Sequence, residues 1–152
     1  MGSIEDEIKS SKFQSEEHKA RINVLFTANW LSNQTKIILR PSGLSAEQFN
    51  VLRILRGSSP KSMCQKDILG RMLAKQSNLT LIINKLKTKK LIQVKTSSKD
   101  KREYMISILP FGLNTLKKID VEIKNSGSLE LGLNTSEAFH LNALLDKLRC
   151  IE

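Results

Sequence analysis

Short polar side chains begin one stretch of this chain that otherwise has the pattern of a helix. Amide and hydroxyl groups donate and accept hydrogen bonds without forming covalent intermediates, and they match the base edges in a DNA major groove. Base recognition is therefore the chemistry that we expect from Gln76, Ser77, Asn78 and Thr80. Ser77 also suits a helix N-cap, a role that is compatible with a contact to DNA.

A basic tip at residues 98–102 provides the second group of candidates. Arg102 has the side chain that narrow minor grooves attract, and the nearby Lys99 and Lys101 are expected to contact phosphate. Asp100 does not favour DNA by its own charge, so we expect it to hold Arg102 through a charge-assisted hydrogen bond. The alternative is an exposed ion pair of little energetic value.

The period of the apolar residues changes between these two groups. Residues 76–90 carry an apolar stripe at helical spacing, which comprises Leu79, Ile82, Ile83 and Leu86. Residues 92–96 and 104–108 then alternate as two strands of a hairpin, with the basic tip between them. A helix that enters a groove and a cationic hairpin beside it predict a winged helix, in which residues 76–90 form the recognition helix.

Two more helices are expected before the recognition helix. Ser45 and Gln48 have the spacing of a capping box at the start of the first, and Ser62 and Gln65 repeat that spacing at the start of the second. The buried side of the second helix is expected to comprise Ile68, Leu69, Met72 and Leu73. This arrangement predicts a helix-turn-helix, and the expected fold class is mainly α with a small β-hairpin wing.

We divide the chain into residues 1–43, 44–110 and 111–152. The central part has every element of a winged helix-turn-helix DNA-binding domain. The N- and C-terminal parts carry apolar helical stripes that so small a domain does not need, so we predict that they form a dimer interface with a second copy. The alternative is that these helices cover the core of their own chain.

The 152 residues carry a formal net charge of +10, and the excess lies in the middle of the chain. Residues 41–110 hold 14 basic and four acidic side chains, whereas the parts before and after are close to neutral. A basic excess confined to a predicted helix and hairpin indicates a surface that binds phosphate. Lys85 belongs to that surface, whereas a solvated face is an equally good interpretation for Lys87, Lys89, Lys90 and Lys95.

Several classes of protein are not indicated. No apolar run approaches the roughly 20 residues that span a bilayer, and no signal-peptide pattern is present. Cys64 and Cys150 make neither a disulfide framework nor the spacing of a metal site. The sequence has neither a paired nucleophile and base nor a phosphate-binding glycine loop, so it does not indicate an enzyme. We therefore expect no cofactor, no metal and a cytoplasmic location, with the protein on the nucleoid when it binds DNA.

Residues 44–52, LSAEQFNVL, resemble the opening of the MarR family domain. Asp100-Lys101-Arg102, followed after a strand by Leu109-Pro110-Phe111-Gly112, is similar to the wing signature of that family. The resemblance extends over residues 16–150 and implies a homodimeric bacterial transcription regulator on a pseudo-palindromic operator. It further implies repression, and release from DNA by a small aromatic or phenolic effector or by thiol oxidation.

The chain departs from the family pattern at three positions. Lys90 replaces the usual glycine after the recognition helix, Pro110 replaces a capping threonine, and Leu81 stands where a basic residue is common. The first two changes are structurally tolerable. Leu81 implies either a changed base preference, through contact with a thymine methyl group, or a weaker grip on phosphate.

An effector pocket would lie between the first, second and fifth helices of the family fold. Phe26 and Trp30 would line it and Arg53 would meet an acid group, although aromatic side chains in a helical stripe are more often core residues. Cys64 begins a predicted helix, where a thiol pKa falls and a redox sensor can arise. An unreactive, half-buried cysteine is the favoured interpretation of Cys64.

Two other functions are compatible with the same fold. A winged helix can serve as a protein-interaction module for an acidic partner, because fold alone does not determine function. It can also bind DNA without sequence preference, as chromatin proteins do. Sequence-specific binding distinguishes the regulator from both alternatives.

Overall fold

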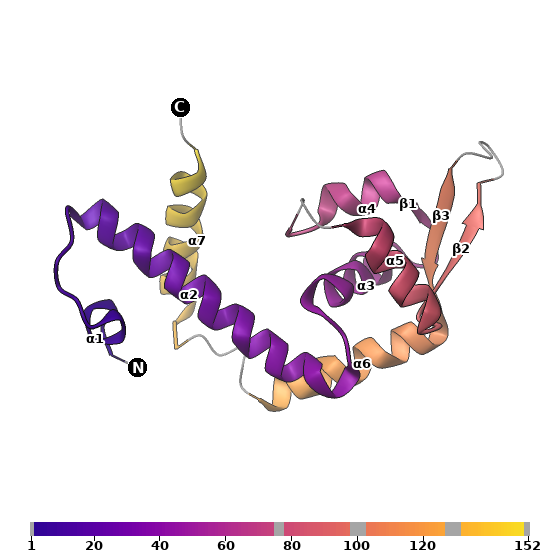
Figure 1. The fold of residues 1–152 in the computed structure, drawn as a ribbon, viewed down its shortest axis with the longest axis horizontal. Helices are drawn as coiled ribbons and strands as arrows, with labels where there is room; N and C mark the ends of the chain where they lie inside the picture. The colour runs from indigo at the N-terminus through magenta and orange to yellow at the C-terminus, as the bar shows by residue number, and fades with distance from the viewer. Residues whose placement is uncertain (1, 75–77, 98–102, 127–131, 151–152) are drawn as a thin grey trace. The chain divides into compact units, whose positions relative to one another are not determined.

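The computed structural model describes residues 2–74, 78–97, 103–126 and 132–150. The chain divides into two compact units, residues 1–119 and 120–152, and each is described by itself. In chain order the elements are α1 (Ile4–Ile8), α2 (Glu16–Leu39), the 3₁₀ turn η1 (Arg40–Ser42), α3 (Ala46–Ser58), β1 (Met63–Cys64), α4 (Gln65–Arg71), α5 (Leu79–Thr88), β2 (Ile92–Thr96), β3 (Tyr104–Ile108), α6 (Pro110–Asn125) and α7 (Thr135–Arg149) (Figure 1).

The N-terminal helices follow local capping signals. The Ser3 side chain accepts a hydrogen bond from the Asp6 backbone N–H and caps α1, and Glu5 of this helix pairs with Lys19 of α2. Helix α2 ends in η1, after which Gly43 adopts a φ of 62°. A left-handed residue of this kind stops a helix, and glycine adopts it without a steric cost.

Helix α3 begins with the predicted capping box. Ser45 Oγ accepts the Gln48 backbone N–H at 3.2 Å, and Gln48 Oε1 accepts the Ser45 N–H at 3.3 Å. The helix packs against α4 and α5. Side chains from several elements meet in the core of the first unit with no more than 2% exposure, among them Val51, Leu52, Leu55, Ile68, Leu86, Ile92 and Ile106.

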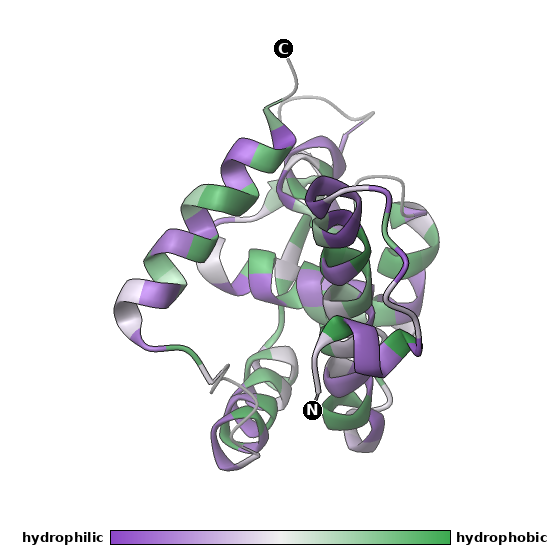
Figure 2. Ribbon diagram, turned by 90° about the vertical axis from the view of Figure 1, so that its left-hand side faces the viewer, coloured by the Kyte–Doolittle hydropathy of each residue, from purple (hydrophilic) through white to green (hydrophobic). Residues whose placement is uncertain are grey.

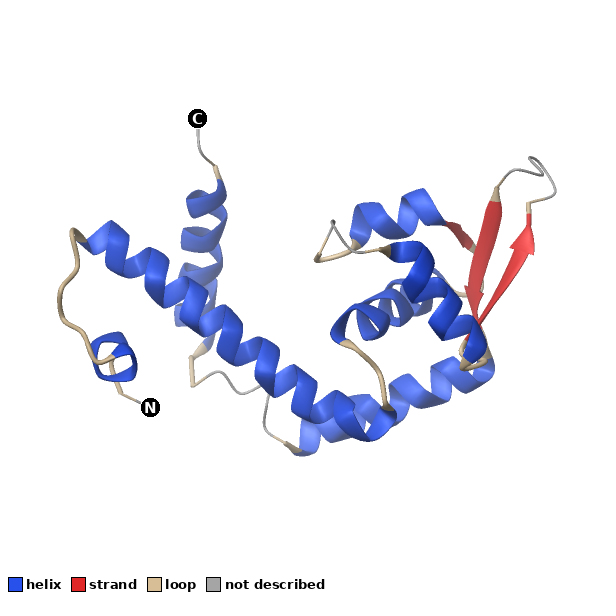
Figure 3. Cartoon of the chain, viewed as in Figure 1, coloured by secondary structure: helices blue, strands red, loops and turns tan. Residues whose placement is uncertain are grey.

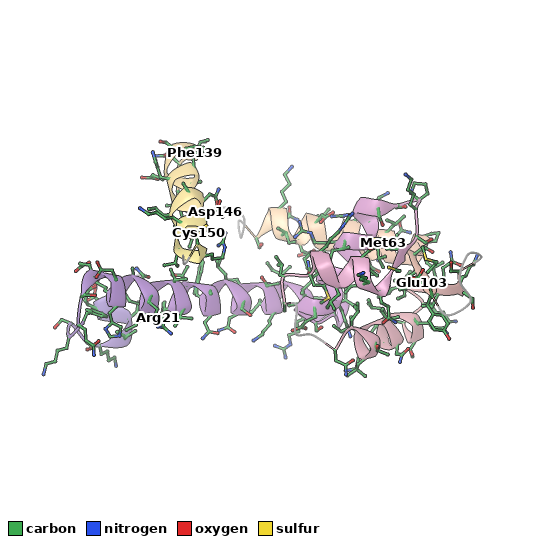
Figure 4. The ribbon with its side chains drawn as sticks, turned by 90° about the horizontal axis from the view of Figure 1, so that it is seen from above. Arg21, Met63, Glu103, Phe139, Asp146 and Cys150 are labelled. Atoms are coloured by element: carbon green, nitrogen blue, oxygen red, sulfur yellow. The ribbon has the colours of Figure 1, made fainter. Side chains whose placement is uncertain are left out.

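The sheet has one strand that the sequence did not indicate. Strands β2 and β3 form the predicted hairpin, with Ile92 opposite Ile108, and β1 adds to its outer edge in the order β1-β3-β2 (Figure 3). In β1, Met63 (labelled in Figure 4) pairs with Ile106 and is 5% exposed. The predicted capping box at Ser62 and Gln65 is therefore wrong, because Met63–Cys64 is a strand and Cys64 makes no side-chain cap.

The buried side of α4 is narrower than predicted. Ile68 and Met72 are buried, but Leu69 is 36% exposed and Leu73 is 89% exposed. Helix α4 ends at Arg71, so Leu73 lies beyond the helix and does not continue its stripe. Its backbone N–H instead donates to Asn50 Oδ1 on α3, at 3.1 Å.

Helix α6 begins at Pro110, as expected for a residue that suits the first turn of a helix. Its first turn lies tightly against the segment that follows α5. A Cβ atom on Gly112 would contact the Leu91 carbonyl oxygen and would lie 2.8 Å from Ile108 Cγ1. The glycine in the wing signature therefore has a packing reason.

The second unit contains α7, which is capped by Asn134 and Glu137 as a capping box. Apolar and polar bands alternate along this helix, which leads to the C-terminus (Figure 2). None of its residues is buried. No helix among the described residues is both long and apolar enough to cross a membrane.

Candidate nucleic-acid interface

Helix α5 has one buried side and one exposed side. Its stripe of Leu79, Ile82, Ile83 and Leu86 is buried, as predicted, and packs against α3 and β2. The opposite side of the same helix is exposed and comprises Thr80, Leu81, Asn84, Lys85 and Thr88. We call these five residues the outward face of α5. They carry amide, hydroxyl and ammonium groups beside a single apolar side chain.

Asn78 is the N-cap of α5, so this helix begins later than the predicted residue 76. Its Oδ1 accepts the Leu81 backbone N–H at 3.2 Å, and the residue is exposed. Capping uses the side-chain oxygen and leaves the amide nitrogen as a donor. The predicted contact of Asn78 with DNA is therefore compatible with its capping role. Gln76 and Ser77 lie outside the described residues.

Asn84 was absent from the candidates taken from the sequence. It is exposed on the outward face, one helical turn after Thr80. The signal was available, because a residue four positions after a candidate lies on the same side of a helix. The sequence prediction covers only the polar residues of the first turn, Gln76, Ser77, Asn78 and Thr80.

A groove of about 320 Å³ runs beside the outward face, between the starts of α3 and α5. Its lining includes Asn78, Leu81 and Lys85 from α5 and Glu47 from α3. The Ser45 side chain, which donates a hydrogen bond to Glu47, is the main reason that the pKa of this carboxyl lies below its usual range. Glu47 therefore keeps its negative charge at neutral pH, which favours the approach of phosphate to the Lys85 side rather than the α3 side.

Two adjacent lysines at the end of α5, Lys89 and Lys90, have different structural roles. Lys89 Nζ donates to the Gly43 carbonyl oxygen and lies 3.5 Å from Gln48 Oε1, so it ties α5 to the start of α3. Lys90 has a φ of 56°, the left-handed conformation that explains why glycine is usual at this position. Lys85, Lys87 and Lys90 are exposed.

The wing is described up to its tip. Below the tip, the Ser97 N–H donates to the Glu103 carbonyl oxygen at 2.8 Å, and Lys95 on β2 is exposed. The predicted phosphate and minor-groove contacts of Lys99, Lys101 and Arg102, and the orienting role of Asp100, lie outside the described residues. They stay predictions from the sequence.

The three effector candidates come from two helices. Phe26 and Trp30 are half-buried and one turn apart on α2, and Arg53 is exposed on α3. The Arg53 guanidinium lies over the ring of Phe49, 5.7 Å from its centroid. This cation–π contact gives Arg53 a partner within its own helix. The proposed pocket around these residues stays a prediction.

Cys64 and Cys150 are both free, and Cys64 is half-buried next to β3. Among the described residues, no group of three histidine, cysteine or acidic side chains is placed to hold a metal ion.

Together, α3, α4, α5 and the three-stranded sheet form a winged helix-turn-helix domain, with α5 in the position of the recognition helix. The family model described as MarR family matches residues 44–104, which cover this domain from the start of α3 into β3. The resemblance to the MarR family is thus confirmed, and the fold is that of MarR-family transcription regulators. A search of curated proteins finds no match to the sequence.

Solved structures of other proteins have a similar fold over most of this chain. A putative MarR-like transcription regulator from Bacillus cereus ATCC 10987 has a TM-score of 0.76 and 21% identity, covering 88% of this chain and 96% of that chain. A mutant of E. coli MarR complexed with operator DNA has a TM-score of 0.77 and 18% identity, covering 91% and 99%. The third structure is BpsR of Bordetella bronchiseptica, a protein whose DNA binding is regulated by 6-hydroxynicotinic acid. It has a TM-score of 0.65 and 24% identity, covering 83% of this chain and 98% of that chain.

Proposed function

We propose that this protein is a sequence-specific double-stranded DNA-binding transcription regulator that acts as a homodimer. The observation that carries the proposal is the outward face of α5. Its buried stripe fixes the helix on α3 and β2, so the opposite side presents hydrogen-bonding groups on a rigid element. The E. coli MarR structure with a similar fold is a complex with operator DNA.

Charge supports DNA as the partner. The basic excess of the chain lies within residues 41–110, which contain the recognition helix and the wing. The exposed Lys85, Lys87, Lys90 and Lys95 belong to this part. Each phosphate contact releases counterions, so the affinity should fall steeply as salt rises.

Exposed apolar side chains support the homodimer. On α7, Leu141, Leu144 and Leu148 have exposed fractions of 41%, 64% and 52%, and they share one side of the helix. On α2, Leu25 and Ile37 are 61% and 64% exposed. A self-complementary interface would cover such surfaces and would present two recognition helices to half-sites about one helical turn apart.

The proposal also includes the direction of regulation and a small-molecule effector. The protein represses by occupying a pseudo-palindromic operator in the cytoplasm, and a small aromatic acid releases it. Phe26, Trp30 and Arg53 are the residues that we assign to the effector, because a ring and an acid group suit aromatic and guanidinium side chains. The ligand shifts a pre-existing equilibrium between two separations of the recognition helices.

The test is selection of bound duplexes from a random pool, followed by titration of the enriched site at several salt concentrations. We expect a two-fold enriched site, and we expect Thr80→Ala and Lys85→Ala to weaken binding. Tight, salt-dependent binding without any enriched site would instead identify a non-specific DNA binder. Absence of binding even at low salt would leave a protein-interaction module.

A further inference from the structure

The outward face of α5 contains one apolar side chain among polar and basic ones. Leu81 is 50% exposed, whereas no member of the buried stripe on the same helix exceeds 8%. Its neighbours on the face, Thr80, Asn84 and Lys85, are all exposed. A single exposed leucine is ordinary on a protein surface, and it is the position of Leu81 inside a basic face that matters: a partner that is anionic overall would meet an apolar side chain at this point.

Leu81, Asn84 and Thr88 point most directly away from the buried stripe, and Leu81 and Asn84 are the two of them nearer the start of α5. At about 100° per residue, both point within about 30° of the direction opposite the buried stripe. They are separated by about 4.5 Å along the helix axis, which is close to the step of about 3.4 Å between base pairs. When α5 enters a major groove, the two side chains therefore reach neighbouring base pairs.

The chemistry of each side chain selects one base. Thymine is the base that presents a methyl group in the major groove, and a leucine contacts it without competing for hydrogen bonds. Adenine presents one acceptor, N7, beside one donor, the N6 amino group. The Asn84 amide matches this pair, because its nitrogen donates and its oxygen accepts. Guanine presents two acceptors at the same positions and is a poorer match.

We propose that Leu81 and Asn84 read neighbouring A·T pairs in each half-site, Leu81 through a thymine methyl group and Asn84 through adenine N6 and N7. This inference rests on the proposed DNA-binding function and specifies its operator. Leu81, which departs from the basic residue common in the family, is then a specificity residue and not a defect in phosphate binding.

The test uses the operator enriched from random duplexes. Each thymine is replaced in turn by deoxyuridine, a change that removes only the methyl group. At one thymine in each half-site, the affinity of the unmodified protein should fall about fourfold. Leu81→Ala should bind the thymine and uracil operators equally. At the neighbouring pair, the protein should prefer adenine by about 5- to 150-fold, and Asn84→Ala should lose most of this preference.

Two further variants separate base reading from general weakening. Lys87→Ala removes a charge from α5 outside the outward face, so it should weaken binding to every sequence and leave the ratio between thymine and uracil operators unchanged. Leu81→Arg should change the selected base from thymine to guanine, because arginine binds guanine O6 and N7.

The outcomes distinguish this inference from the function on which it rests. If a site is enriched but each replacement of thymine by uracil has the same effect on the unmodified protein and on Leu81→Ala, the reading of a methyl group is wrong and sequence-specific binding stands. If no site is enriched, both proposals are wrong. Thermal unfolding of each variant checks that the fold is retained.

Discussion

Helices α5 and α7 have the same apolar spacing but opposite environments. The stripe of α5 exposes at most 8% of any of its side chains, whereas the Leu144 and Leu148 side chains of α7 are 64% and 52% exposed. The first stripe meets α3 and β2 within its own unit, whereas in the described structure no residue of α7 is buried. Periodicity shows that a helix has an apolar side to cover, but it does not show which chain covers that side.

This difference matches the two tasks in the proposed function. A recognition helix has to present its outward face in a fixed orientation, and burial of the opposite side achieves this within one chain. A dimerisation helix has to leave its apolar side available to a second copy. Substitutions in the two stripes should therefore change different quantities.

The largest expected effect comes from the buried stripe of α5. Leu86 is fully buried, so Leu86→Ala should lower the free energy of unfolding by about 2–5 kcal/mol, through lost burial and the cavity left behind. Urea denaturation monitored by circular dichroism measures the change. Leu81→Ala, on the exposed side of the same helix, is the matched control and should lose less than about 1 kcal/mol. Equal losses in the two variants would contradict the described burial of α5.

The next effect concerns the tight packing at the end of α5. Gly112→Ala should lower the free energy of unfolding by about 1–3 kcal/mol, because its Cβ would contact the Leu91 carbonyl oxygen and the Ile108 side chain. Gly57→Ala on α3 is the control. No atom lies within 4 Å of a Cβ placed there, so this change should stabilise the protein by about 0.5–1 kcal/mol through helix propensity. A Gly112→Ala variant as stable as the unmodified protein would show that α6 can move away from Leu91.

The exposed stripe of α7 should respond in association and not in folding. Leu144→Ala should raise the dimer dissociation constant roughly 30-fold, because a two-fold interface loses the contact twice, at about 2 kcal/mol in total. Sedimentation equilibrium measures the constant. Asn142→Ala, on the opposite side of the helix, should leave it unchanged. If Leu144→Ala instead destabilises the isolated protomer by as much as Leu86→Ala, this stripe belongs to the core of its own chain.

The sequence predicted the parts of the fold that local signals determine. The capping box at Ser45 and Gln48, the buried stripe of α5 and the pairing of β2 with β3 all depend on residues close together in the chain. Each of these signals is a short-range spacing with a direct physical meaning.

Other parts depend on tertiary contacts that no local pattern contains. Strand β1 has only two residues, too few for an alternating pattern, and it forms because Met63 pairs with Ile106. Lys89 resembled the lysines around it, but its ammonium group donates to the carbonyl oxygen of Gly43, just before the start of α3. In the candidate interface, Asn84 was predictable from its helical position and was missed. That Asn78 caps α5 with its side-chain oxygen and is still exposed could be seen only in the structure.

The smallest expected effect concerns the residues at which α5 and α7 end. After α5, Lys90 donates to the Lys87 carbonyl and the buried Leu91 donates to the Leu86 carbonyl at 3.1 Å, which together form a Schellman motif. After α7, Cys150 donates to Lys147 with a φ of −85°. The end of α5 thus depends on a lysine in the left-handed conformation, which costs a residue with a side chain about 1–2 kcal/mol.

Lys90→Gly should therefore raise the free energy of unfolding by about 0.5–1 kcal/mol, the relief of the left-handed conformation less the greater freedom of glycine in the unfolded chain. Lys90→Ala is the matched control, since it removes the same charge and keeps the unfavourable φ. DNA affinity should fall equally in both variants, because both lose one exposed ammonium group, whereas only the glycine variant should gain stability. If alanine stabilises the protein as much as glycine does, charge repulsion among Lys87, Lys89 and Lys90 limits stability at this helix end, and the Schellman geometry is not the cause.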